Sequence, residues 1–83
     1  MNQQQITVKI IDIIFNLLEN NKLIITENSS SENIAEWNSL KHIQIINEVE
    51  KQFEVNFDID DILDLITVQD IATKILELKN EAH

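Results

Sequence analysis

The sequence contains no cysteine, no glycine, no proline and no arginine. Without cysteine the chain has no disulfide, no thiolate metal ligand and no thiol nucleophile. Without glycine it lacks the Asn-Gly and Asp-Gly turns that most often join the strands of a β-hairpin. These absences favour an all-helical fold, and the spacing of the apolar residues supports that expectation.

The length and the apolar content indicate one small folded unit. The 83 residues suffice for a single domain with a modest core, and 43% of them are hydrophobic. We therefore expect residues 1–83 to form one domain and to be monomeric. No apolar stretch reaches the length that spans a bilayer, and the polar start over residues 1–5 lacks the basic region of an export signal. These features predict a cytoplasmic protein with no membrane partner.

Acidic residues outnumber basic ones. Fifteen Asp and Glu face six Lys, which gives a formal net charge of −9. Such a chain repels the phosphates of nucleic acids and of anionic lipids, so we expect it to bind neither; basic protein surfaces would attract it. The acids are densest between residues 48 and 64. Two interpretations stay open for them: a solvated face that keeps the protein soluble, and a surface that recognises a partner.

Apolar residues recur at helical spacing in four segments. They predict helices over residues 4–19, 39–53 and 59–65 and a fourth helix from residue 68, with a long loop over residues 22–38. The expected fold is a small all-α four-helix bundle in which the third helix is short. The positions expected in or beside the core are Ile6, Val8, Ile10, Ile11, Ile13, Ile14, Phe15, Leu17 and Leu18; Leu23, Ile24, Ile25, Ile34 and Trp37; Leu40, Ile43, Ile45, Ile46, Val49 and Phe53; and Val68, Ile71, Ala72, Ile75 and Leu76.

Polar residues mark the ends of these helices. An asparagine of the pair 20–21 is expected to end the first helix in the left-handed conformation, since no glycine is present. Asp58 is the expected N-cap of the short third helix. Thr67 immediately precedes the fourth helix. Asp70 lies three residues after Thr67, which is the spacing of a capping box.

Ser39 lies where the polar loop gives way to the second helix. A hydroxyl at that point is exposed beside the positive end of a helix dipole, where it could carry a phosphate. A serine at a helix start is most often only a cap, but Asn38 can serve as the cap by itself. Trp37-Asn38-Ser39-Leu40, the apolar register up to Phe53, then Phe57 and Thr67-Val68 together resemble, in order and spacing, the acyl carrier protein family. The resemblance covers nearly the whole chain.

The resemblance implies a function. Ser39 matches the position that bears a 4′-phosphopantetheine arm, which a phosphopantetheinyl transferase adds from coenzyme A. The arm would hold an acyl or aminoacyl group as a thioester and deliver it to partners such as an acyl ligase, an acyltransferase or a synthase of fatty acid or polyketide biosynthesis. The chain would itself be no enzyme, because it has no nucleophile–base pair and too few residues for a deep pocket. The alternative is a non-covalent helical interaction module in which Ser39 is only a helix cap.

The second helix departs from the family pattern in its charges. The residue before the expected attachment site is Asn38 rather than aspartate. Lys41, Gln44 and Lys51 take positions that are typically acidic in the carriers of fatty acid synthesis, and Glu50 keeps the negative sign. We therefore expect a discrete carrier that serves a specialised pathway. The expected docking surface for partner enzymes consists of Asn38, Leu40, Lys41, Gln44, Glu48, Glu50 and Lys51.

Other residues that could carry chemistry give weaker signals. His42 follows Ser39 by three residues but has no Asp or second His at dyad or ligand spacing, which favours a half-buried, hydrogen-bonded histidine. Residues 58–64 resemble a calcium loop in composition, yet the required glycine and distal glutamate are missing, so no metal site is expected. Trp37 is expected to anchor the loop, and the terminal His83 to be disordered.

Overall fold

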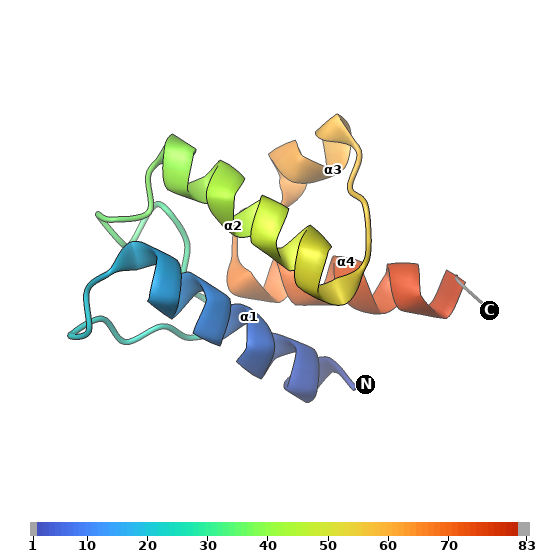
Figure 1. Cartoon of the computed structure of the whole chain (residues 1–83), viewed down its shortest axis with the longest axis horizontal. Coiled ribbons are helices and arrows are strands. Elements are labelled where there is room, and N and C mark those ends of the chain that lie inside the picture. Colours follow the sequence, from blue (N-terminus) through green and yellow to red (C-terminus); the bar gives the residue numbers. More distant parts are fainter. Residues whose placement is uncertain (1, 82–83) are drawn as a thin grey trace.

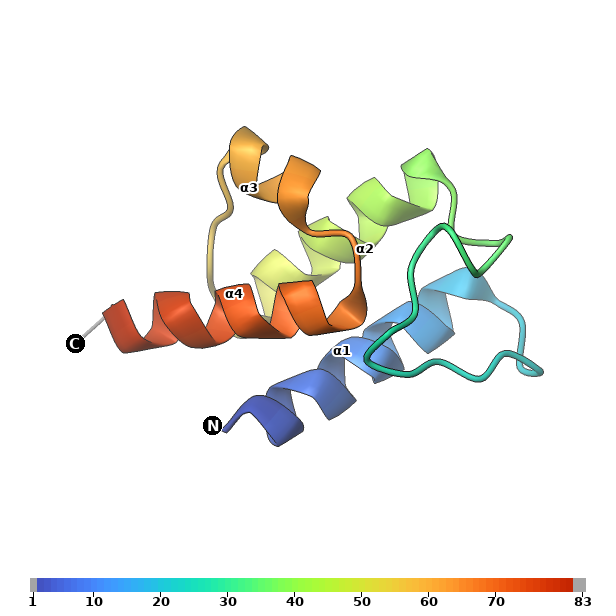
Figure 2. The same ribbon diagram turned by 180° about the vertical axis from the view of Figure 1, so that it is seen from behind.

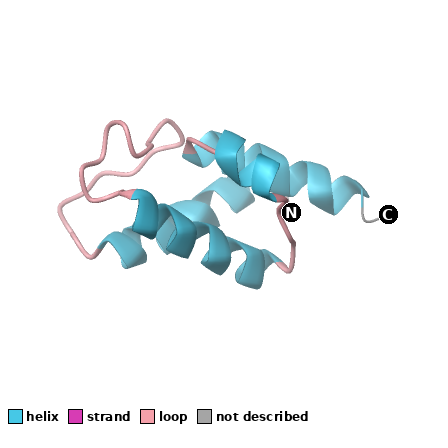
Figure 3. Cartoon of the chain, turned by 90° about the horizontal axis from the view of Figure 1, so that it is seen from above, coloured by secondary structure: helices cyan, strands magenta, loops and turns pink. Residues whose placement is uncertain are grey.

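The structure is a computed structural model that describes residues 2–81, and within them the chain forms four helices (Figure 1). The helices are α1 (Gln3–Leu18), α2 (Ser39–Phe53), α3 (Ile59–Asp64) and α4 (Val68–Glu81). The described part of the chain has no strand, only an isolated bridge between Ser30 and Thr67, and loops join the helices (Figure 3). The predicted all-α fold with a long first loop and a short third helix is confirmed. His83 lies outside the described residues.

Three long helices enclose the core, and the short one lies at its edge. α1 packs against both α2 and α4. α3 lies on the side of the bundle that faces away from α1, and the long loop and the two chain ends lie at opposite ends of the molecule (Figures 1 and 2). No helix within residues 2–81 is both long and apolar enough to cross a bilayer.

Branched aliphatic side chains dominate the core. Full burial of one such side chain stabilises a fold by about 1.5–3 kcal/mol relative to leaving it exposed. α1 and α4 supply the most completely enclosed positions, and the loop adds Trp37, which is 1% exposed. The buried hydrophobic residues are Ile6, Ile10, Ile13, Ile14, Leu18, Ile25, Ile34, Trp37, Ile45, Ile46, Val49, Phe53, Phe57, Leu65, Val68, Ile71, Ala72 and Ile75.

Several positions predicted in or beside the core are wrong. Leu40 and Ile43 are 64% and 54% exposed, whereas Ile45, predicted at the margin of the core, is completely buried. The cause is that apolar residues occupy more than half of the circumference of α2, and only the stripe with Ile45, Ile46, Val49 and Phe53 is buried. In the loop Ile24 is 85% exposed, and on α1 Val8 and Phe15 are also exposed. Ile11, Leu17, Leu23 and Leu76 are half-buried at the edge of the core.

Glutamates, not asparagines, take the left-handed conformation at the helix ends. Glu19 ends α1 and Glu54 ends α2, each with a φ of 57°. The prediction that an asparagine at 20–21 would do so is wrong, because α1 already ends at Leu18 and the left-handed residue follows directly. The side chain of Asn20 instead donates to Glu36 and accepts a hydrogen bond from Lys22 N–H. A side chain with a Cβ pays roughly 1–2 kcal/mol in this conformation.

The long loop is fixed to the start of α4. The carbonyls of Glu27 and Ser29 accept hydrogen bonds from the N–H groups of Gln69 and Val68, at 2.9 and 3.1 Å. Thr67 completes the cap, since its hydroxyl accepts from Asp70 N–H while its own N–H donates to the Asp70 carboxylate. The predicted capping box is confirmed, and the loop thereby reaches the start of α2 along a defined path.

Candidate functional site

Ser39 is the first residue of α2, and it is exposed. Asn38 precedes it in an extended conformation, and its side-chain oxygen accepts a hydrogen bond from Lys41 N–H at 2.9 Å. The Asn38 carbonyl accepts the hydrogen bond of His42 N–H at 2.8 Å. Asn38 therefore caps α2 as predicted, and the hydroxyl of Ser39 is not needed for that purpose.

The start of α2 suits a negatively charged group. Backbone N–H groups in the first turn of a helix have no partner within the helix, and they point along the positive end of its dipole. The first turn of α2 carries no acidic residue, whereas α3 begins with Asp60 and Asp61 and α4 with Asp70. A phosphate group joined to Ser39 would thus meet the dipole without an opposing carboxylate in the same turn.

A cleft of about 420 Å³ opens beside Ser39. This volume lies in the range of small-ligand sites, and apolar side chains supply much of the lining. The loop, the first turn of α2, α3 and the link to α4 all contribute to it. The lining residues are Ser31, Trp37, Asn38, Ser39, His42, Ile62, Leu63, Leu65 and Ile66.

Trp37 and His42 form a hydrogen-bonded pair within this lining. The indole Nε1–H donates to His42 Nδ1 at 3.0 Å, and the two rings stack with centroids 6.0 Å apart and an interplanar angle of 26°. Burial lowers the pKa of His42, and a backbone hydrogen bond with Ile62 partly offsets that effect. His42 is half-buried and hydrogen-bonded, as predicted, and Trp37 anchors the end of the loop.

Exposed apolar residues lie on the elements that form the cleft, and two of them, Leu63 and Ile66, line it. Ile59 and Leu63 of α3 are 77% and 72% exposed, and Ile66, in the link to α4, is exposed as well. Leu40 and Ile43 of α2 are also exposed. Ile62, Leu63 and Ile66 line the cleft but were not predicted as site residues. The signal available was the short length of the third helix, which leaves several of its apolar residues without a core to enter.

Some of the predicted docking residues are exposed on α2, and others make structural contacts. Leu40, Gln44 and Lys51 are exposed, and Glu48, which is half-buried, accepts a hydrogen bond from Gln52. Lys41 instead donates from its Nζ to the Leu17 carbonyl at 2.9 Å, across to the end of α1. Lys41, Gln44, Glu48 and Lys51 line a hollow with Leu17, Glu19 and Asn47, distinct from the cleft beside Ser39.

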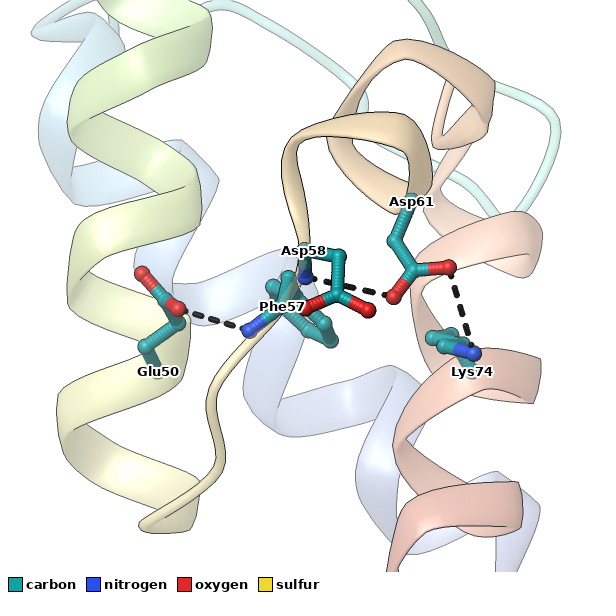
Figure 4. A network of polar contacts seen from close by, with 5 residues as sticks. All are labelled: Glu50, Phe57, Asp58, Asp61 and Lys74. Atoms are coloured by element: carbon teal, nitrogen blue, oxygen red, sulfur yellow. Dashed lines mark hydrogen bonds and ion pairs between the residues drawn. The ribbon is translucent and has the colours of Figure 1, made fainter.

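Glu50 also has a structural contact. Its carboxylate accepts a hydrogen bond from Phe57 N–H at 2.8 Å and so holds the chain between α2 and α3 (Figure 4). Beyond it, Asp58 N–H donates to Asp61, and Asp61 pairs with Lys74 of α4 at 3.3 Å. Figure 4 shows these contacts running from Glu50 of α2, past the start of α3, to Lys74 of α4. Within residues 2–81 no three His, Cys, Asp or Glu side chains are grouped as a metal site would require.

The comparisons with known proteins bear on the same residues. The family described as "Phosphopantetheine attachment site" matches residues 16–75, a range that includes Ser39 and most of the cleft. The chain belongs to this carrier protein family. Its prosthetic group is 4′-phosphopantetheine, and carriers of this family hold acyl groups for enzymes instead of catalysing reactions. A comparison with curated protein sequences gives no match.

Two solved carrier protein structures are similar to the chain. A Mycobacterium tuberculosis protein assigned as an acyl carrier protein has a TM-score of 0.77 and 26% identity, with 88% of this chain and 97% of that chain covered. The holo acyl carrier protein from Geobacter metallireducens has a TM-score of 0.77 and 25% identity, with 94% of this chain and 93% of that chain covered. Both agree with an acyl carrier protein fold over most of the chain.

Proposed function

We propose that Ser39 is the residue of this carrier protein to which the 4′-phosphopantetheine arm is attached, and that residues 1–83 act as one carrier domain. The observation that carries the proposal is the division of roles at the start of α2: Asn38 caps the helix, while the exposed Ser39 hydroxyl borders the cleft. Ser29 and Ser30 are buried, so they are poor acceptors of a bulky group.

In the attachment reaction this chain supplies only the serine nucleophile and the helix start that receives the phosphate. Ser39 Oγ forms a bond to the phosphorus of coenzyme A that bears pantetheine, the bond from that phosphorus to the adenosine-bearing phosphate breaks, and the serine proton passes to a base of the phosphopantetheinyl transferase. The first turn of α2 then stabilises the new phosphodiester through its N–H groups and dipole. When bound, the arm supplies the thiol that carries cargo as a thioester.

The cleft offers shelter for the cargo. Its apolar side chains would cover part of an aliphatic acyl chain, and the exposed apolar residues around it would contact a partner enzyme. Carriers of this family act with a phosphopantetheinyl transferase and with biosynthetic enzymes. For this chain we propose an acyl ligase, an acyltransferase or a synthase of a specialised pathway in the cytoplasm, with the carrier acting as a monomer.

Mass spectrometry after incubation with coenzyme A and a broad-specificity transferase tests the attachment site. We expect one phosphopantetheine per chain, mapped to Ser39, and none in Ser39→Ala. Ser31→Ala is the matched control, because Ser31 is an exposed serine that lines the same cleft. Modification that persists in Ser39→Ala, or that disappears in Ser31→Ala, would contradict the assignment. A folded chain that accepts no arm at all would favour a non-covalent interaction module.

The proposed specialised pathway has a separate test. Charge complementarity steers carrier and enzyme together, and like charges at a contact oppose binding. We expect the modified protein to be a poor substrate for generic fatty acid synthase enzymes. Gln44→Glu combined with Lys51→Glu should raise the acylation rate, more so at low ionic strength. If the protein without these substitutions is already acylated as fast as a housekeeping carrier, charge on α2 does not explain the choice of partner.

A further inference from the structure

One side chain connects three of the segments that form the cleft. His42 belongs to α2, its Nδ1 accepts the indole hydrogen of Trp37 at the end of the loop, and it makes a backbone hydrogen bond with Ile62 of α3. The contact with Trp37 requires a neutral imidazole with an unprotonated Nδ1 as acceptor, and this leaves Nε2 as the protonated nitrogen available to the Ile62 backbone.

The contact with α3 matters because few other contacts hold that helix. None of the six residues of α3 is buried, and Phe57 and Leu65, the buried residues that flank it, lie just outside the helix. Ile62 is half-buried against the edge of the core, and the other contacts at α3 run through Asp61 to Lys74 and, just ahead of it, through Glu50 to Phe57 N–H. A segment with so little buried surface opens locally at low free energy.

We propose that His42 is a positioning residue whose neutral imidazole keeps the loop and α3 closed around the cleft beside Ser39, and whose protonation opens that cleft. A proton on Nδ1 would place an N–H group against the Trp37 N–H group, so the hydrogen bond between the rings would break and the two donors would repel each other. The link from the loop to α3 through this side chain would then be lost, while the core between α1 and α4 stays intact.

Among residues 2–81, no charged side chain lines the cleft together with His42. On α2 the neighbouring Lys41 reaches to the Leu17 carbonyl, and in the loop Glu36 accepts a hydrogen bond from Asn20 while Glu32 is exposed. On α3 Asp61 and Asp64 line a different hollow with Lys74 and Glu77, and Asp60 is exposed. The imidazole therefore titrates against a largely apolar surrounding. Its burial lowers the pKa, so opening should occur below pH 6.5, the ordinary value for histidine.

Attachment of the arm to Ser39 should also affect the protonation of His42, and this step rests on the proposed function. Ser39 and His42 are three residues apart on α2, a spacing that brings side chains to one face of a helix. A phosphodiester on Ser39 would add a negative charge near the imidazole, which favours the protonated form. Attachment of the arm should thus shift the opening to higher pH.

The single tryptophan of the chain gives a direct readout in the unmodified protein. Trp37 fluorescence and the nuclear magnetic resonance signal of its indole N–H would be followed between about pH 8 and pH 5. We expect one transition below pH 6.5, an indole signal that moves as the hydrogen bond breaks, and protection factors of the α3 amides about fivefold lower on the acid side, the size expected for the loss of one hydrogen bond. Helical circular dichroism should stay constant through the transition.

Two variants separate positioning from simple packing. His42→Gln keeps a side chain that accepts and donates hydrogen bonds but does not titrate, so we expect flat pH profiles with α3 protected throughout. His42→Phe keeps a ring without either hydrogen bond, so α3 should be poorly protected at every pH. Either variant titrating as the wild type does, or a Trp37 transition that coincides with loss of helix, would overturn the proposal.

The Ser39→Ala variant distinguishes this proposal from the proposed function. It cannot carry the arm, yet it should titrate as the unmodified wild-type protein does. The modified wild type should titrate at higher pH. Failure of modification would therefore contradict only the assignment of Ser39, whereas an unchanged midpoint in the modified protein would overturn the coupling between the arm and His42.

Discussion

α4 and α3 follow one another in the chain, yet different interactions hold them. α4 places Val68, Ile71, Ala72 and Ile75 completely inside the core, whereas none of the six α3 residues is buried. α4 is also tied to the loop through backbone hydrogen bonds at its start. α3 depends on the residues that flank it and on polar contacts through His42, Asp61 and Glu50 (Figure 4).

The difference separates a stable frame from a loosely held cover. The frame, which consists of α1, α2 and α4, carries Ser39 at the first position of α2. The cover, α3, packs only Ile62 against the edge of the core, and its other apolar side chains, Ile59 and Leu63, are exposed. A carrier has to present its cargo and then release it, and a weakly held element beside the attachment site allows that without loss of the fold.

The largest effect should come from truncation of core residues in the frame. Ile75→Ala removes a completely buried side chain, so we expect a loss of about 2–5 kcal/mol in the free energy of unfolding. Leu63→Ala on α3 is the matched control, and it should change that free energy by about 0.5 kcal/mol or less. Urea denaturation monitored by circular dichroism gives both values. Similar losses at the two positions would remove the distinction between frame and cover.

Lys41 stabilises the contact between α2 and the end of α1 within the frame. Its Nζ bonds to the Leu17 carbonyl, at the negative end of the α1 dipole. Lys41→Glu should therefore lower the free energy of unfolding by about 1 kcal/mol, because it replaces a favourable charge by an unfavourable one. Gln44→Glu, at an exposed position on the same helix, should change it by about 0.5 kcal/mol or less. Equal denaturation midpoints for the two variants would mean that Lys41 is only a surface charge.

The helices were predictable because their signals are local. The helix over 39–53 is confirmed at both ends, since Asn38 supplies the cap and the apolar register stops at Phe53. The fourth helix begins at Val68 as the Thr67–Asp70 box indicates. The exposure of Leu40 and Ile43 was not predictable in the same way, because it depends on which stripe of α2 the other helices cover.

The candidate site was predictable in part. The position of Ser39 and its independence from the cap followed from neighbouring residues. The contacts of Lys41 with α1 and of Glu50 with Phe57 N–H join segments that only the fold brings together. A charge pattern along one helix assigned both residues to partner docking, and that assignment is still an untested prediction. The pairing of Trp37 with His42 likewise depends on how the loop, through the extended Asn38, enters the first turn of α2.

A substitution in the segment that joins α2 to α3 should stabilise the protein. Glu54 ends α2 in the left-handed conformation, which glycine adopts without the steric cost of a Cβ. Glu54→Gly should raise the free energy of unfolding by about 1 kcal/mol. Gln52→Gly, two residues earlier inside the helix, should lower it by a similar amount, about 1 kcal/mol. If both glycines destabilise the protein, the left-handed residue is not a source of strain.

The smallest effect should come from the acids around the cover. Asp60, Asp61 and Asp64 lie on a six-residue helix, and Asp61 is paired with Lys74. Repulsion among exposed charges weakens with ionic strength, so the Tm should rise by a few degrees between about 10 mM and about 1 M sodium chloride. Asp60→Asn should raise the Tm at low salt and reduce the salt dependence, whereas Asn47→Asp on the frame should change both less. A Tm that stays flat or falls with salt would mean that contacts within the fold already compensate the acids, and that α3 is weak for lack of buried surface alone.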